Sequence, residues 1–158
     1  MIRHVVLFFS VLTTGVIAGI IFGIWIGYNP RDLSAMAYVE QQQNAIRALN
    51  VLMPVLGLIA IVLTVTAAFL QRSDRPTFVV LLIAAVLLLI SGVITRFGNQ
   101  PLNAIVITWD LSAIPADWKE FRDKWWSFHI MRTISALLAF SLIVWSAIRK
   151  YKFESTSR

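Results

Sequence analysis

The residues of this chain that could take part in chemistry gather around and after the stretch SGVITRFGNQPLNAIVITWD. Asn99, Asn103 and Asp110 lie in it, and His129 and Arg132 follow at the start of the last apolar run. Histidine and aspartate can exchange protons, whereas arginine and asparagine can hold anions and carbonyl oxygens. These side chains either form one polar pocket or mark ordinary helix ends that face water.

The composition indicates that a membrane surrounds most of the chain. The 158 residues are 58% hydrophobic and 14% charged, against about 25% charged residues in a typical soluble domain. About 20 apolar residues in a helix cross the hydrocarbon core of a bilayer. We therefore predict an all-α, integral membrane four-helix bundle that forms one domain (1–158), with spans at about 5–28, 49–70, 77–96 and 130–149.

The first apolar run is expected to be a retained span. It is longer than the apolar core of a secretory signal, and no small-residue cleavage site closes it.

The basic residues predict the orientation of the spans. Four spans place both ends of the chain on one side, together with the turn QRSDR, and these short segments carry their Lys and Arg residues close to the spans. The opposite side carries as many, but they are spread over longer loops and mixed with acidic residues. The positive-inside bias acts on short flanking segments, so we expect a bacterial inner-membrane protein with both termini in the cytoplasm.

The net charge of +6 then reflects this topology and contact with the anionic heads of the lipid bilayer. It gives no support for binding to nucleic acid.

Two helices are expected to extend beyond the bilayer. The segment DLSAMAYVEQQQNAIRALNVLMP has no breaker before Pro54, so the second span should begin above the membrane and kink near that proline. The segment IPADWKEFRDKWWSFHIMRTISALL likewise runs without a breaker into the fourth span. Between them, Gly98 should end the third helix, Pro101 should stop it, and residues 101–110 should restart as a short interfacial helix.

Each candidate polar residue has a simpler interpretation beside the functional one. Asn99 could cap a helix, Arg132 could extend to the interface, and Trp109 and Trp125 could belong to an aromatic belt. Polar residues at this depth usually face the interior of a bundle. We therefore expect one cavity near the outer interface that gathers polar residues from separate segments, namely Asn103, Asp110, His129 and Arg132. Gln43, Arg47 and Asn50 form a polar stripe at the start of the second span, and Gln43 or Arg47 should also contribute to this cavity.

Metal and cofactor chemistry have little support in the residue types. The chain has no cysteine, and its two histidines, His4 and His129, should lie on opposite sides of the membrane. A carboxylate-rich cluster of the di-iron kind is missing from the spans. We expect no metal or cofactor, with a haem bound through His129 alone as the minor alternative.

Small residues on the first span could support self-association. Gly15, Gly19 and Gly23 follow one another at four-residue spacing, which lets another helix approach closely. The partner is either a second copy, giving a homo-oligomer, or another span of the same chain.

Three segments resemble the successive signatures of a family of small four-span membrane proteins. The segments are AYVEQQQNAIRALNVLMP, GNQPLNAIVITWD and WKEFRDKWWSFHIMRTISALLAF, and the family, mostly of unknown function, includes the anthrone oxygenases. Ala104 stands where members commonly have a second asparagine. The family pattern matches Asn99, Pro101, Asn103, Trp109, Asp110, Trp125, His129 and Arg132.

The resemblance implies an oxygenase that oxidises an activated aromatic carbon acid with O₂ and without an evident metal. Such chemistry needs a base, a group that stabilises an oxyanion, and an apolar chamber. His129 or Asp110 would be the base, and Arg132 and the asparagines would hold the oxyanion.

Under this interpretation a lipophilic aromatic or quinol-type substrate enters from the bilayer, and the substrate-binding residues would be Asn99, Asn103, Trp109, Trp125, Gln43, Arg47 and Asn50. The alternative is a non-catalytic membrane protein that binds a lipid or quinone, or that serves as a partner subunit or scaffold.

Overall fold

The computed structural model describes residues 1–156, and it describes side chains as far as residue 149. The described residues form helices and turns and contain no strand, which confirms the predicted all-α fold. The elements are α1 (Ile2–Gly27), the 3₁₀ turn η1 (Pro30–Asp32), α2 (Ala35–Leu49), α3 (Leu52–Leu70), α4 (Arg75–Ile94), the π-helical turn η2 (Thr95–Asn99), α5 (Gln100–Val106) and α6 (Trp118–Thr156).

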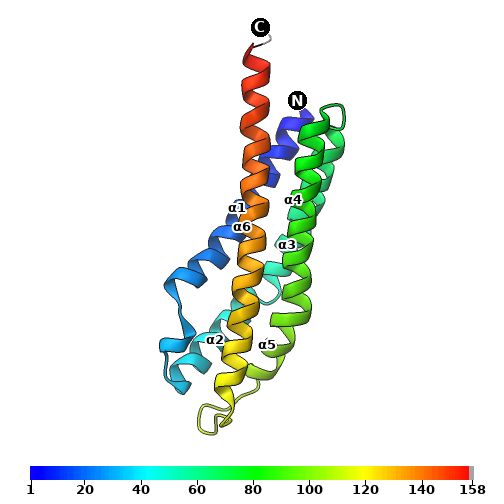
Figure 1. Cartoon of the computed structure of the whole chain (residues 1–158). Helices are drawn as coiled ribbons and strands as arrows, with labels where there is room; N and C mark the ends of the chain where they lie inside the picture. Colours follow the sequence, from blue (N-terminus) through cyan, green and yellow to red (C-terminus); the bar gives the residue numbers. More distant parts are fainter. Residues whose placement is uncertain (157–158) are drawn as a thin grey trace.

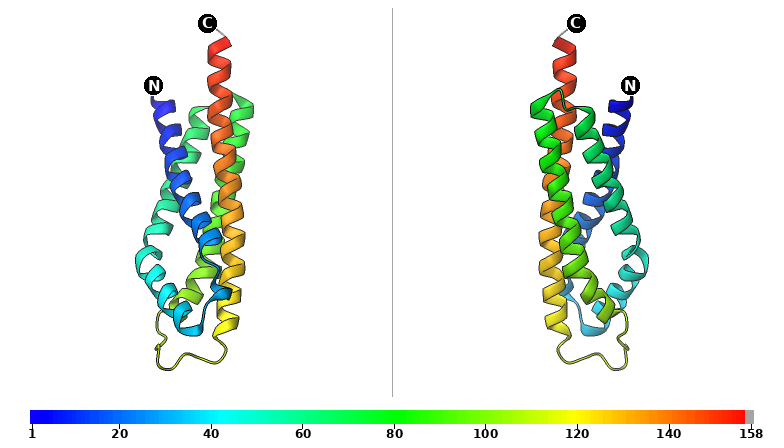
Figure 2. Two further views of the ribbon diagram at one scale, coloured as in Figure 1. Left: turned by 90° about the vertical axis from the view of Figure 1, so that its left-hand side faces the viewer. Right: turned by 90° about the vertical axis from the view of Figure 1, so that its right-hand side faces the viewer.

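The four long helices α1, α3, α4 and α6 form a bundle (Figures 1 and 2). Helix α1 packs against α3 and α6, and α4 packs against the same two helices from the other side. Both ends of the chain and the α3–α4 turn lie at one end of the bundle. The short helices α2 and α5 and the loop before α6 lie at the opposite end, where the candidate polar residues are found.

The outer surface of the bundle is suited to hydrocarbon. Four helical segments are long and apolar enough to cross a membrane, and they correspond to the predicted spans. Large apolar side chains point outward, among them Leu58 at 63% exposure and Leu89 at 54%. Polar side chains inside the bundle join neighbouring helices instead, as between the hydroxyls of Ser10 and Thr64 at 2.9 Å. The chain is therefore an integral membrane protein.

The second helical region breaks earlier than we predicted. We expected a continuous helix kinked near Pro54, but α2 ends at Leu49 and α3 begins at Leu52. Proline lacks an N–H, and its ring collides with the carbonyl four residues before it, here that of Asn50. The Nε2 of Gln100 donates a hydrogen bond to this carbonyl at 3.3 Å, so a side chain of α5 replaces the missing helical donor.

A short helix follows the third span as we predicted, namely α5, but the third helix does not stop at Gly98. Instead α4, η2 and α5 form one continuous helix from Arg75 to Val106. In the π turn the N–H of Gln100 donates to the carbonyl of Thr95, five residues back, and this wider turn lets Pro101 follow without a break.

Gly98 serves close packing rather than helix termination. A Cβ added to it would lie 2.7 Å from the Cγ of Phe128, so the ring of α6 rests directly on the η2 backbone. The prediction failed because glycine is common both after a helix and under a close contact, and the sequence does not distinguish these uses.

Helix α6 confirms the prediction of an unbroken helix that runs into the fourth span, since it is continuous from Trp118.

The three glycines of α1 at four-residue spacing have different surroundings. A Cβ added to Gly15 would lie 3.1 Å from the Phe140 ring of α6, whereas the space beside Gly19 and Gly23 is open. Gly15 therefore serves a contact within the chain, and self-association through Gly19 and Gly23 stays a prediction.

Candidate functional site

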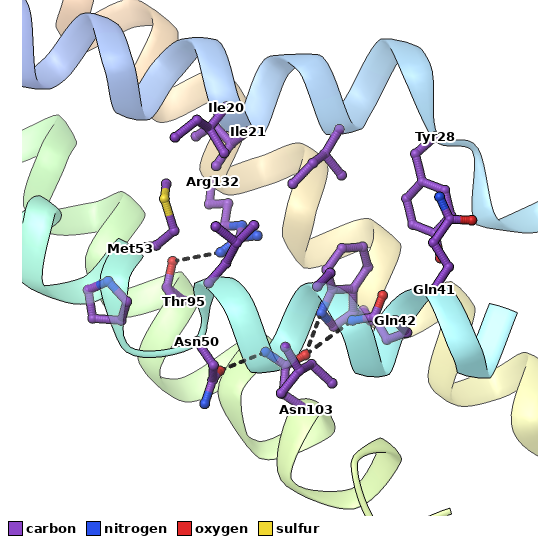
Figure 3. Close-up of a pocket in the computed structure, with 16 residues that line it drawn as sticks. Ile20, Ile21, Tyr28, Gln41, Gln42, Asn50, Met53, Thr95, Asn103 and Arg132 are labelled. Carbon is purple, nitrogen blue, oxygen red and sulfur yellow. Dashed lines mark hydrogen bonds between the residues drawn. The ribbon is translucent and has the colours of Figure 1, made fainter.

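A cavity of about 190 Å³ lies between α1, α2, the start of α3 and α6. Its walls are mostly apolar, and its polar side chains come from five separate elements (Figure 3). It is large enough for a small organic molecule rather than a single water. The residues that line it are Ile20, Ile21, Ile24, Tyr28, Gln41, Gln42, Ala45, Ile46, Leu49, Asn50, Met53, Pro54, Thr95, Asn103, Trp125 and Arg132.

Arg132 supplies the positive charge of this cavity. Its Nη2 lies 2.9 Å from Nδ1 of His129, and its Nη1 donates to the hydroxyl of Thr95 at 3.4 Å. The guanidinium carbon also lies 5.9 Å from the centre of the Trp125 ring. No carboxylate among the described side chains lies within ion-pair distance of it. A charge within a span costs roughly 2.5–3.5 kcal/mol on insertion scales. An anionic ligand would offset this cost by pairing with the Arg132 guanidinium.

His129 is fully buried directly behind Arg132. Its Nε2 lies 3.0 Å from the carbonyl oxygen of Ile21, which can only accept, so Nε2 carries the proton. Its Nδ1 then accepts from Arg132, and the imidazole is neutral with both nitrogens occupied. The ring stacks on those of Trp125 and Trp126, with centroids 5.0 and 5.4 Å away. In this state His129 offers no free lone pair to a substrate proton or to a haem iron.

Asn103 joins three elements at the wall of the cavity. Its Oδ1 accepts from Nε1 of Trp125 at 2.8 Å and from Nε2 of Gln42 at 3.3 Å. Its Nδ2 donates to Oδ1 of Asn50 at 2.9 Å. Asn99, also buried, donates from Nδ2 to the backbone carbonyl of Trp125 at 3.0 Å. The asparagines therefore hold Trp125 and the α2–α3 break in position.

Two polar atoms at the far end of the cavity have no partner. Oε1 of Gln42 and the hydroxyl of Tyr28 are buried without a hydrogen bond, and both residues line the cavity. Figure 3 shows Tyr28 and Gln42 at the end away from Arg132. A buried acceptor without a partner costs about 1–3 kcal/mol, so these atoms mark a place for a ligand that donates a hydrogen bond.

We did not predict either residue from the sequence. Gln42 lies on one helical stripe with Ile46 and Leu49, so the stripe beside Gln43 could have suggested it. Tyr28 ends an apolar run and gave no signal.

Asp110 is not part of the cavity, so the predicted convergence of four residues is wrong for this one. Helix α5 ends at Val106, and the chain then turns outward. The exposed carboxyl of Asp110 accepts from the backbone N–H and the hydroxyl of Ser112, both at 2.9 Å. These hydrogen bonds hold the pKa of Asp110 below its usual value, which stabilises a loop carboxylate and provides no base.

Gln43, Arg47 and Trp109 also lie outside the cavity and hold the loop that follows α5. Nε2 of Gln43 donates to the backbone carbonyls of Val106 at 3.1 Å and Trp109 at 2.9 Å. Arg47 donates from Nη2 to Oε1 of Gln43 at 3.2 Å. The Trp109 ring packs edge-on against Phe121. Of the predicted residues, those that line the cavity are Asn50, Asn103, Trp125 and Arg132, with Asn99 and His129 directly behind them.

The fold and the cavity define a small helical membrane protein with a half-buried arginine at an apolar cavity. The family model of anthrone oxygenase matches residues 42–142, more than half of the chain, so this chain belongs to that family. The match includes the asparagines, Trp125, His129 and Arg132, as the sequence resemblance predicted. Neither a curated protein nor a solved structure matches the chain.

Proposed function

We propose that this chain is a membrane oxygenase that binds a lipophilic aromatic carbon acid in the cavity and promotes its reaction with O₂. The observation that carries the proposal is Arg132, a half-buried guanidinium that faces an apolar chamber and has no carboxylate partner among the described side chains. Membership in the anthrone oxygenase family supports the same chemistry.

The reaction balances without a cofactor. Loss of a proton from a CH₂ group beside a carbonyl and an aromatic ring gives an enolate, whose carbon then donates electrons to O₂. The net change converts CH₂ and O₂ into C=O and H₂O, so the substrate itself supplies the electrons. The protein has to favour the enolate and position it, which a fixed cation in a low-dielectric site does.

Arg132 would hold the enolate oxygen. Thr95 and His129 orient its guanidinium, and the Ile and Leu side chains exclude water from the aromatic rings. At the other end, Gln42 Oε1 would accept a hydrogen bond from a substrate hydroxyl, and the Tyr28 hydroxyl would donate one to the oxygen of that hydroxyl. The cavity therefore favours a molecule with a carbonyl beside an acidic CH₂ group at one end and a hydroxyl at the other.

His129 would receive the proton. Its Nδ1 is blocked by Arg132 in the empty site, but the carbonyl oxygen of a bound substrate competes for the same guanidinium. When Arg132 turns to that oxygen, Nδ1 becomes a free base beside the forming enolate. Substrate binding would thus expose the base.

A second candidate function is the binding of a quinone or lipid without turnover. Occupation of both ring nitrogens of His129 favours it, and among the side chains that the structure describes no aspartate or glutamate lines the cavity. The protein would then be a carrier, a partner subunit or a scaffold.

One experiment separates these functions. The protein is placed in lipid nanodiscs with a hydroxylated anthrone, and O₂ uptake, quinone absorbance and equilibrium binding are measured. We expect saturable O₂ uptake that Arg132→Gln abolishes and that Arg149→Gln, an exposed position on the same helix, leaves unchanged. Binding without O₂ uptake in the unmodified protein would support the non-catalytic function and reject the oxygenase.

We also propose that the protein lies in a bacterial inner membrane with both termini in the cytoplasm. The basic residues of the ends and of the α3–α4 turn support this orientation.

A further inference from the structure

A second cavity, also of about 190 Å³, adjoins the first on the other side of Arg132. The two share the walls formed by Arg132, Thr95 and Met53. The second cavity lies mainly between α3 and α4, and its apolar wall includes Leu58 and Leu88. The function proposed above makes no use of it.

The polar side chains of this second cavity are gathered at one end. Arg96, Gln100 and Arg132 line it toward α5, whereas the residues from the middle of α3 and α4 are apolar or small. Arg96 is exposed, and no aspartate or glutamate lines the cavity among the described residues. Two guanidinium groups thus stand at the end of an apolar trough without a negative partner.

The trough opens sideways between two glycines. A Cβ added to Gly57 of α3 or to Gly92 of α4 would meet nothing within 4 Å, so the seam between these helices contains free space. The neighbouring side chains Leu58 and Leu89 are exposed on the surface that faces lipid. An acyl chain in the bilayer could therefore reach the cavity without crossing water.

We propose that the second cavity binds a free fatty carboxylate from the bilayer. Its acyl chain lies between Gly57 and Gly92, and its carboxylate lies between Arg96 and Arg132. A carboxylate suits this end because guanidinium groups bind it through paired hydrogen bonds. Binding requires no turnover, so this inference stands independently of the oxygenase function.

The shared arginine couples the two cavities. A carboxylate that binds Arg132 from the second cavity neutralises the positive charge that Arg132 presents to the first cavity. We therefore expect a fatty acid to weaken the binding of an anionic ligand in the first cavity, and the reverse by the same factor.

Binding of radiolabelled palmitate to the protein in phosphatidylcholine nanodiscs tests the proposal. Gly57→Leu and Gly92→Leu add a side chain where a Cβ meets nothing within 4 Å, and both should weaken palmitate binding by about tenfold or more, as should Arg96→Gln. Gly19→Leu, which also adds a side chain to open space on a membrane helix, and Arg149→Gln are the matched controls and should bind as the unmodified protein does.

Hexadecanol, which has the same chain without the charge, should not displace palmitate. Displacement by hexadecanol, or equal binding by the glycine variants and their control, would overturn the proposal. Loss of palmitate binding when phosphatidylglycerol replaces part of the lipid would assign the cavity to a phospholipid and overturn the fatty-acid assignment. The ligand comparison uses the unmodified protein, so it decides the question even if a variant does not fold.

Discussion

One hydrogen bond between Arg132 and His129 determines what either side chain can do. It leaves the imidazole neutral and its Nδ1 occupied, and it points the guanidinium at an apolar chamber. The sequence predicted that these two residues belong together because three residues along a helix place side chains on one face. It did not predict their mutual contact, because Arg132 was expected to share a cavity with Asp110 and the asparagines.

Arg132 has no carboxylate because the α5 helix ends before Asp110. Whether a residue seven positions after Asn103 shares its face depends on whether the helix continues that far, and an apolar sequence contains no clear stop signal there. Asn103 and Trp125 line the cavity because both lie within continuous helices, and their role in substrate binding stays a prediction. Tyr28 and Gln42 were missed because their importance rests on the absence of a partner, which only the packed structure shows.

His129→Gln separates a base from a positioning residue. Glutamine can donate to the Ile21 carbonyl and accept from Arg132, so it can keep the guanidinium in place, but it cannot take a proton. We expect turnover of a hydroxylated anthrone to fall about 100-fold or more, while the Kd of the substrate stays within a few-fold. Turnover close to that of the unmodified protein would show that His129 only positions Arg132.

Asn103→Ala tests the connection between helices. The substitution removes the acceptor of the Trp125 indole N–H and of the Gln42 amide. Each buried donor left without a partner costs about 1–3 kcal/mol, so the unfolding free energy in detergent should fall by at least that amount. Asn44→Ala, at an exposed position on α2, is the control, and equal effects of the two substitutions would contradict a structural role for Asn103.

At the scale of elements, the long helices followed from the sequence and their breaks did not. Apolar length predicted the spans, and the absence of Gly and Pro predicted continuous α6. The two prolines were misinterpreted because proline forbids a hydrogen bond but does not specify the replacement. Gln100 supplies a donor to the Asn50 carbonyl near Pro54, and the π turn accommodates Pro101.

Gly98→Ala tests the close contact between η2 and α6. The new Cβ would lie 2.7 Å from the Phe128 ring, and such overpacking typically costs about 1–3 kcal/mol. We expect a lower melting temperature for this variant in detergent. Gly19→Ala, with open space beside it, should melt no lower than the unmodified protein.

The double variant Gly98→Ala, Phe128→Ala identifies the cause of that loss. If the ring is what the new methyl meets, the effect of Gly98→Ala should largely vanish in the Phe128→Ala background. An unchanged effect would place the strain elsewhere in the π turn.

At the scale of the whole molecule, the two ends of the bundle differ in the segments that connect the helices. At the end with both termini the helices are joined by a short turn, whereas the other end carries α2, α5 and the loop before α6 (Figure 1). The cavity with Arg132 is lined by residues of α2 and α5 and so lies toward this second end.

Reporter fusions test the orientation. Fusions at the turn of residues 71–74 and after the last residue should both report the cytoplasm, and a fusion at Ala116 should report the external side, because basic residues flank the spans on the first side. The reverse pattern would place the end of the bundle that carries α2 and α5 in the cytoplasm. The fusions report the side of the membrane directly, so the readout does not depend on activity.

The π turn has a consequence for how this family varies. Thr95 and Asn103 both line the cavity, yet they are eight residues apart, and a regular α-helix would turn them about 80° away from each other. The extra residue of the wide turn removes that offset. A homologue with one residue fewer between these positions would close the turn into ordinary α-helix, place them seven apart, and keep both on the same face. A one-residue gap between Thr95 and Asn103 is thus a deletion that an alignment of relatives should tolerate.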